Sequence, residues 1–195
     1  MPVTIDGSPT HVLIVHVVVV LLPVAVLASL VLVAVPATRR AFSLLTLVVA
    51  FVACVAIPLA FLSGSRLEAQ LPPSSLIRRH VQVAHELLPL AALYGVVLAA
   101  FVGVDLVRRS RSGQLNDLER RFVPTGAGPE GTARSGLVAA YRLSAVALVV
   151  LAALTGIQVY RVGDAGAKAA WAGRLSPNGP PPAPQAGHGK PPSGR

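Results

Sequence analysis

The chain has few of the residues that cover the surface of a soluble domain. Among its 195 residues, 13% are charged and 5% are aromatic, and there is a single cysteine, Cys54. One cysteine excludes an internal disulfide, and the lack of a C-x-x-C-H motif excludes covalent attachment of haem in the c-type manner. Because 53% of the residues are apolar, a soluble fold would have too little polar surface to cover its core. The composition predicts an integral membrane protein.

Four apolar runs are each long enough to cross a bilayer. About 20 residues of helix span the hydrocarbon core, and lipid offers no hydrogen-bond partners to a backbone that is not helical. We therefore predict an all-α fold, a bundle of four transmembrane helices within residues 11–174, after a short external N-terminus at residues 1–10. The predicted spans are residues 12–35, 41–62, 85–107 and 137–160.

The positive charges flank these runs in short clusters. Arg39 and Arg40 directly follow the first run, whereas no Lys or Arg precedes it. The positive-inside rule then places both termini outside the membrane and the first loop in the cytoplasm. Topology accounts for the net charge of +9 better than nucleic-acid binding does, since no basic surface interleaved with aromatic residues is present.

Two segments outside the spans have their own patterns. Residues 116–119 resemble a capping box, and Leu115, Leu118 and Phe122 are spaced to share one helical face, which predicts a short amphipathic cytoplasmic segment lying on lipid headgroups. Residues 175–195 are rich in Pro and Gly, a composition typical of a disordered tail.

Two pairs of histidines with the same spacing open the first and third spans. His11 and His16 open the first run, and His80 and His85 open the third, on the same side of the membrane. Residues five apart on a helix point in different directions, so useful pairs form between helices. We predict a deeper pair, His16 with His85, and a shallower pair, His11 with His80.

Such pairs suit haem b or a transition metal, because four-helix bundles build these sites from side chains on facing helices. Glu86 could join His16 and His85 around a metal, or pair with Arg79 at the interface. Arg161 could bind a haem propionate, a quinone oxygen or Asp164. The alternative for this end of the fourth span is an interfacial girdle anchored by Tyr160 and Trp171.

Two stretches carry a resemblance to a known family. They are His11-Val-Leu-Ile-Val-His16, followed by Pro23, and Gly156 through Val159-Tyr160-Arg161-Val162-Gly163-Asp164. From Thr10 to Trp171 the chain resembles the bacterial membrane family catalogued as domain of unknown function 2231, which opens with H-x-x-x-x-H and ends near Y-R-x-G. Many members have proline after each of the first two histidines, where this chain has Val12 and Val17. The resemblance implies four spans and no established activity, and relatives are sometimes associated with electron-transfer modules.

Three functions remain open from the sequence. The first is an accessory or scaffold component of the membrane, whose histidines make only hydrogen bonds between helices. The second is a b-type haem protein that passes electrons, with His16 and His85 as axial ligands and respiratory or other membrane redox proteins as partners. The third is a metal or quinone site on the same imidazoles. No G-x-S-x-G, H-E-x-x-H or P-loop motif indicates a hydrolytic enzyme.

Overall fold

The computed structural model describes residues 4–5, 8–121 and 130–171, and the burial of side chains over residues 11–110 and 135–171. A two-residue strand pair, β1 (Thr4–Ile5) antiparallel to β2 (Ser8–Pro9), leads into the first helix. The helices are α1 (Thr10–Ala34), the 3-10 turn η1 (Pro36–Thr38), α2 (Arg39–Glu68), α3 (Ser75–Arg121) and α4 (Glu130–Trp171).

All four long helices are apolar enough and long enough to cross a membrane, which confirms the predicted four-helix fold. Each predicted span lies on one helix, except that Val35 follows the end of α1, and α2, α3 and α4 continue beyond the apolar runs. At the start of α3, the hydroxyl of Ser74 accepts a hydrogen bond of 3.3 Å from the amide of Leu76 and so caps the helix. Ser8 and Pro9 form β2, and α1 begins at Thr10.

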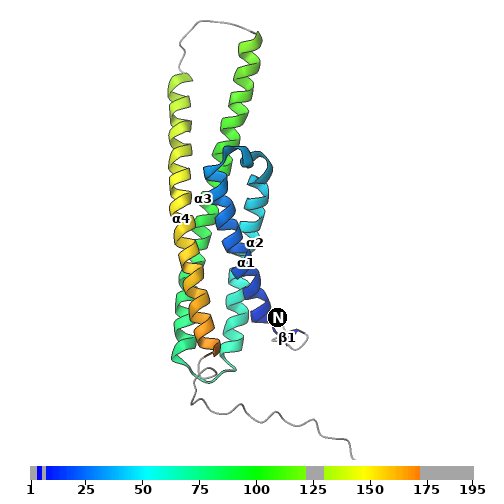
Figure 1. The fold of residues 1–195 in the computed structure, drawn as a ribbon, viewed down its shortest axis with the longest axis vertical. Helices are drawn as coiled ribbons and strands as arrows, with labels where there is room; N and C mark the ends of the chain where they lie inside the picture. Colours follow the sequence, from blue (N-terminus) through cyan, green and yellow to red (C-terminus); the bar gives the residue numbers. More distant parts are fainter. Residues whose placement is uncertain (1–3, 6–7, 122–129, 172–195) are drawn as a thin grey trace, which may run out of the picture.

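The bundle consists of two hairpins, α1–α2 and α3–α4, packed side by side (Figure 1). Helix α1 packs on α2 and α4, and α3 packs on the same two helices. Therefore α1 and α3 occupy diagonal corners of the bundle. We call the end that holds His11 and His80 the histidine end, and the end that holds the α1–α2 turn the turn end. Beyond the turn end, α3 and α4 project together past the α1–α2 hairpin (Figure 1).

The expected amphipathic segment is part of this projection. Residues 115–121 continue α3 and do not form a separate short helix. The residues from Leu90 to Arg121 contain no proline, so nothing in the backbone stops α3 at Asn116. The disordered tail predicted for residues 175–195 lies outside the described residues.

The two hairpins are structural repeats of each other. Buried residues of α1 correspond to buried residues of α3 with a constant offset in residue number, and those of α2 correspond in the same way to those of α4. The α1/α3 pairs are Val18/Leu87, Leu22/Ala91, Ala25/Tyr94, Ser29/Leu98 and Leu32/Phe101. The α2/α4 pairs are Thr46/Leu148, Ala50/Ala152, Ala53/Thr155, Ala56/Gln158, Ile57/Val159 and Ser63/Ala165. The offset that relates α1 to α3 also relates His11 to His80 and His16 to His85, so the repeated histidine pairs belong to a repeated two-helix unit.

Candidate functional site

His11 and His80 make equivalent contacts in the two hairpins. Nδ1 of His11 lies 3.0 Å from the carbonyl oxygen of Ala60 on α2, and Nδ1 of His80 lies 3.2 Å from the carbonyl oxygen of Val162 on α4. Because a carbonyl oxygen only accepts hydrogen bonds, Nδ1 carries the hydrogen in both rings. His11 also lies 3.3 Å from the hydroxyl of Ser63. Each histidine therefore joins the first helix of its hairpin to the second.

A glycine lies against each of these two rings. A Cβ added at Gly64 would lie 2.9 Å from Cε1 of His11, and one added at Gly166 would lie 3.1 Å from Cε1 of His80. Both glycines follow the accepting residue, Ala60 or Val162, by one helical turn. A side chain at either position would displace the imidazole, so glycine is what allows the ring to reach the carbonyl.

The deeper histidines have different surroundings from each other. Nδ1 of His16 lies 2.6 Å from the carbonyl oxygen of Val12 on the same helix, and its side chain is exposed. His85 is also exposed, and its ring stacks on Phe61 of α2 with the centroids 4.7 Å apart and an interplanar angle of 21°. No described interaction joins His16 to His85.

The outer histidines, His11 and His80, lie at the same end of the bundle on diagonal helices, and among the described residues no hydrogen bond or ion pair joins them. Within the part of the chain whose side chains are described, no group of three or more His, Cys, Asp and Glu residues could hold a metal ion. Haem ligation by His16 and His85, and a metal site that adds Glu86, stay predictions.

Glu86 and Arg161 belong to a polar network that joins α3 to α4 near the histidine end. Nε2 of the buried Gln158 donates to the carbonyl of Val83 at 2.8 Å and to the carboxylate of Glu86 at 3.1 Å. Arg161 donates to Oε1 of Gln158 at 2.9 Å and lies 3.6 Å from Glu86. Glu86 thus pairs with Arg161 and not with Arg79. The alternative partner of Arg161, Asp164, pairs with Lys168 at 2.7 Å.

A second polar cluster lies at the turn end. The guanidinium group of Arg39, on α2, donates from Nε to the carbonyl of Leu32 and from Nη2 to that of Val33 at 2.8 Å. These carbonyls lie in the last turn of α1, where no further turn of helix supplies a donor. The buried carboxylate of Asp105, on α3, faces Arg39 and accepts a hydrogen bond from Arg109. The cluster links α1, α2 and α3.

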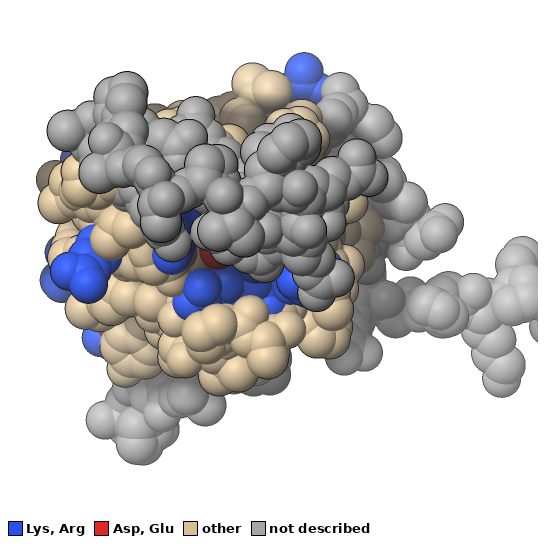
Figure 2. Space-filling view, turned by 90° about the horizontal axis from the view of Figure 1, so that it is seen from above, with Lys and Arg blue, Asp and Glu red and all other residues tan. Residues whose placement is uncertain are grey.

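Tyr141 brings α4 into the same cluster. The guanidinium carbon of Arg39 lies 5.4 Å from the centroid of the Tyr141 ring, and that of Arg108 lies 4.0 Å from it. Both contacts have the geometry of a cation–π interaction. Figure 2 looks down on this end and shows Lys and Arg side chains gathered there, with little acidic surface visible. The turn end is therefore strongly basic among the described residues.

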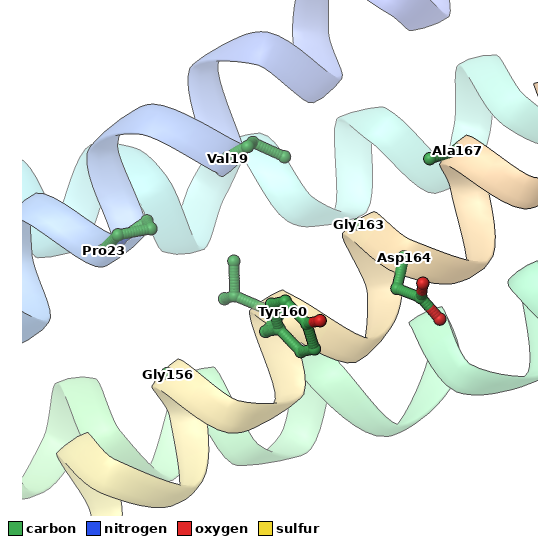
Figure 3. Close-up of a pocket in the computed structure, with 8 residues that line it drawn as sticks. Val19, Pro23, Gly156, Tyr160, Gly163, Asp164 and Ala167 are labelled. Atoms are coloured by element: carbon green, nitrogen blue, oxygen red, sulfur yellow. The ribbon is translucent and has the colours of Figure 1, made fainter.

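An open groove runs between α1 and α4 towards the histidine end (Figure 3). Its volume is about 470 Å³, which is in the range of ligand pockets, roughly 300–1,000 Å³. One wall is Val19 and Pro23 of α1, and the other is a face of α4. The α4 residues are Gly156, Val159, Tyr160, Gly163, Asp164 and Ala167.

The comparisons with known proteins give one match. The sequence model of a family described as "Predicted membrane protein (DUF2231)" matches residues 7–177. The chain belongs to this family. No curated protein and no solved structure matches it. Membership in the DUF2231 family fits the four apolar helices and gives no specific activity.

We did not predict the turn-end cluster of this DUF2231 protein from the sequence, because the histidine pattern concerns only the opposite end of the bundle. Arg39 was explained there only as a topology signal, and Asp105 was not considered. One signal was present, because Asp105 lies inside the predicted third span and an ionisable residue at such a position is unusual. Phe61, Ser63 and Gly64, which contact histidines, gave no sequence signal of their own.

Proposed function

We propose that this DUF2231 protein is an accessory or scaffold component of the bacterial cell membrane, in which the histidine layer fastens each helical hairpin. The observation that carries the proposal is the repeated contact of His11 with Ala60 and His80 with Val162. Each contact satisfies a polar imidazole inside an apolar bundle, where an unpaired group would be costly.

The remaining histidines support the same function. His16 is satisfied by its own helix, and His85 packs on an aromatic ring. The polar groups at both ends of the bundle also bond between helices. A rigid anchor that presents its surface to other membrane proteins requires these contacts and no reactive group.

The test measures stability and partner recovery in the same variants. We expect His11→Ala and His80→Ala each to lower the free energy of unfolding in lipid bicelles by about 1–2 kcal/mol, the upper range for hydrogen bonds between membrane helices. His16→Ala is the matched control and should change stability by less than about 0.5 kcal/mol, as exposed sites do. A membrane partner should copurify in fixed stoichiometry with the wild-type protein in mild detergent. Isolation of the protein without any partner, from native membranes at native abundance, would contradict the scaffold role.

A second candidate, a haem or metal site, is favoured by one feature of the same histidines. Nδ1 is engaged by a backbone carbonyl in His11, His16 and His80, which leaves Nε2 with the lone pair. Histidines that bind metals are commonly oriented by such a bond. The outer pair fits this function better than His16 and His85 do, because Nδ1 of both His11 and His80 is held by a carbonyl of the neighbouring helix. A group bound there would supply redox chemistry, while these residues would hold and orient it.

Optical spectra and metal analysis separate the two candidates. Under the haem hypothesis, purified protein shows a reducible Soret band that is lost in the His11→Ala and His80→Ala variants. Under the metal hypothesis, a stoichiometric metal survives chelation and is lost in the same variants. A colourless, metal-free protein with wild-type folding excludes both and leaves the scaffold function.

A further inference from the structure

Two exposed arginines occupy equivalent positions in the two hairpins. Arg40 lies in the first turn of α2 and Arg142 lies on α4, and the offset in residue number that relates the buried residues of α2 to those of α4 also relates these two. Both side chains are exposed, and neither takes part in an ion pair among the described residues. Their neighbours in the sequence, Arg39 and Tyr141, contact each other in the turn-end cluster. Each hairpin therefore presents one outward guanidinium group at the turn end.

Each of these arginines lies at the end of a row of exposed apolar side chains. Residues three or four apart share one face of a helix, and the residues that follow each arginine at this spacing are apolar. The row on α2 is Leu44, Val48, Phe51 and Val55, and the row on α4 includes Val146, Val150 and Ile157. On a helix that can cross a membrane, such a row contacts acyl chains. Arg40 and Arg142 therefore lie at the level where the acyl chains meet the headgroups.

The turn end has more positive than negative charge. Among the described side chains, Asp105 supplies the one carboxylate at this end, and it is buried beside Arg39 and Arg109. Its charge is thus already shared by two guanidinium groups, and it does not balance Arg40 or Arg142. Figure 2 shows the Lys and Arg side chains at this end, with little acidic surface among them. An anion from outside the protein is needed to balance the two exposed charges.

The phosphate of a bilayer lipid matches the position and the charge of these arginines. A guanidinium group binds a phosphate through two parallel hydrogen bonds, and lipid phosphates lie just outside the acyl chains. A zwitterionic headgroup brings its own ammonium to its phosphate, whereas an anionic headgroup leaves a net negative charge for the arginine. A soluble anion or an acidic protein could reach the guanidinium groups, but it would not use the apolar rows beside them.

We propose that the turn end binds anionic phospholipids at two equivalent sites, one at Arg40 and one at Arg142. In each site the guanidinium group donates to the lipid phosphate, and the acyl chains lie along the apolar row of the same helix. These sites are separate from the histidine contacts and do not depend on the function proposed above.

The first experiment counts the bound lipids. The protein is reconstituted in nanodiscs that contain equal amounts of phosphatidylglycerol and phosphatidylcholine, and the lipids that remain bound are counted by native mass spectrometry. We expect two molecules of phosphatidylglycerol to be enriched on the wild type, one on Arg40→Gln, one on Arg142→Gln and none on the double variant. Each substitution should weaken binding at its own site by about fivefold, the usual effect of one basic residue near an anionic membrane surface.

The matched control removes the same charge at the opposite end of the bundle. Arg79 is also exposed, on α3 at the histidine end, and Arg79→Gln should keep both enriched lipids. Circular dichroism checks that each variant is folded, as substitutions at exposed sites usually are. Equal enrichment on the wild type and the double variant, or an equal loss in Arg79→Gln, would overturn the proposal.

The second experiment separates a lipid from other anions. Excess inorganic phosphate or a soluble polyglutamate peptide should leave the two phosphatidylglycerol molecules in place, because neither contacts the apolar rows. Arg40→Lys should restore part of the enrichment that Arg40→Gln loses, since lysine keeps the charge without the paired hydrogen bonds. Displacement of the lipid by either soluble anion, or a wild-type preference for phosphatidylcholine, would overturn the assignment.

Discussion

The guanidinium group of Arg39 lies 3.7 Å from the carboxylate of Asp105, and each of these side chains is only 8% exposed. The pair connects the start of α2 to α3, beside the turn that ends the first hairpin. Since Arg39 also donates to the last carbonyls of α1, one side chain of the first hairpin links both of its helices to α3. The second repeat has Tyr141 at the position of Arg39, and the two side chains contact each other.

Removal of the acid should therefore destabilise the bundle strongly. We expect Asp105→Ala to lower the free energy of unfolding by about 3–5 kcal/mol, the usual cost of leaving one partner of a buried ion pair alone. The loss is measured by comparing the free energies of unfolding of Asp105→Ala and the wild type in lipid bicelles. The control is Asp164→Ala, which breaks an exposed pair and should cost less than about 1 kcal/mol.

The double variant Arg39→Met with Asp105→Leu gives a further check on the same pair. It should recover much of the loss, because apolar replacement of both partners is often nearly neutral. Equal losses in Asp105→Ala and Asp164→Ala would show that the buried pair contributes little.

The contacts of the two outer histidines predict the effect of adding a single methyl group. The new Cβ of Gly64→Ala would lie 2.9 Å from an imidazole carbon of His11, and that of Gly166→Ala would lie 3.1 Å from one of His80. Both distances are shorter than an ordinary van der Waals contact. We expect each to destabilise the protein by about 1–3 kcal/mol, as overpacking does. Gly103→Ala, where a Cβ meets nothing within 4 Å, should be neutral or stabilising by up to about 1 kcal/mol, from helix propensity.

A double-mutant cycle identifies the histidine as the cause. If the imidazole is what the new methyl group displaces, Gly64→Ala should cost little in a His11→Ala background, and the coupling energy should exceed about 0.5 kcal/mol. Additive effects would mean that the methyl group acts through some other contact.

The fold was predictable because the bilayer imposes a simple rule on the chain. Each apolar run long enough to cross hydrocarbon became one helix. The lateral arrangement was not predictable, because residues that face lipid and residues that face the core are equally apolar. Val20 is 55% exposed and Leu22 is fully buried, and the sequence does not distinguish them.

The candidate site shows the same limit. The spacing of the histidines predicted that His11 and His80 lie at one end of the bundle, but the pairing of Glu86 with Arg161 was not predicted, because the sequence suggested Arg79 for Glu86 and Asp164 for Arg161. The partners of these side chains depend on rotation of each helix about its axis, which hydrophobicity does not fix here. Every residue has a backbone carbonyl, so the sequence does not indicate that those of Ala60 and Val162 accept hydrogen bonds from histidine. The role of Gly64 and Gly166 can be recognised only when the positions of the neighbouring imidazole rings are known.

The buried amide of Gln158 should contribute modestly to the packing of α3 against α4. It makes two bonds to α3, to Val83 and Glu86, and it takes the place of Ala56 in the first repeat. We expect Gln158→Leu to cost about 1 kcal/mol, because hydrogen bonds between membrane helices average about 0.6 kcal/mol. The cost should fall in a Glu86→Gln background. A loss above about 3 kcal/mol would require a larger role for this network.

Replacement of the buried Tyr94 by phenylalanine should stabilise the protein. Its side chain is fully buried in the bundle, and its hydroxyl has no hydrogen-bond partner among the described residues. The Ser29 hydroxyl lies near it and donates its own hydrogen to the carbonyl of Val26 at 2.7 Å, and although its oxygen can still accept, no hydrogen bond joins the two hydroxyls in the structure. An unsatisfied buried hydroxyl costs about 1–3 kcal/mol, whereas phenylalanine keeps the ring and its packing. We therefore expect Tyr94→Phe to raise the free energy of unfolding by about 1 kcal/mol in bicelles, with Phe101→Leu as a control that loses ring packing and is destabilised.

If Tyr94→Phe lowers stability instead, the hydroxyl is satisfied in the membrane, and the same measurement in a Ser29→Ala background tells whether Ser29 is the acceptor.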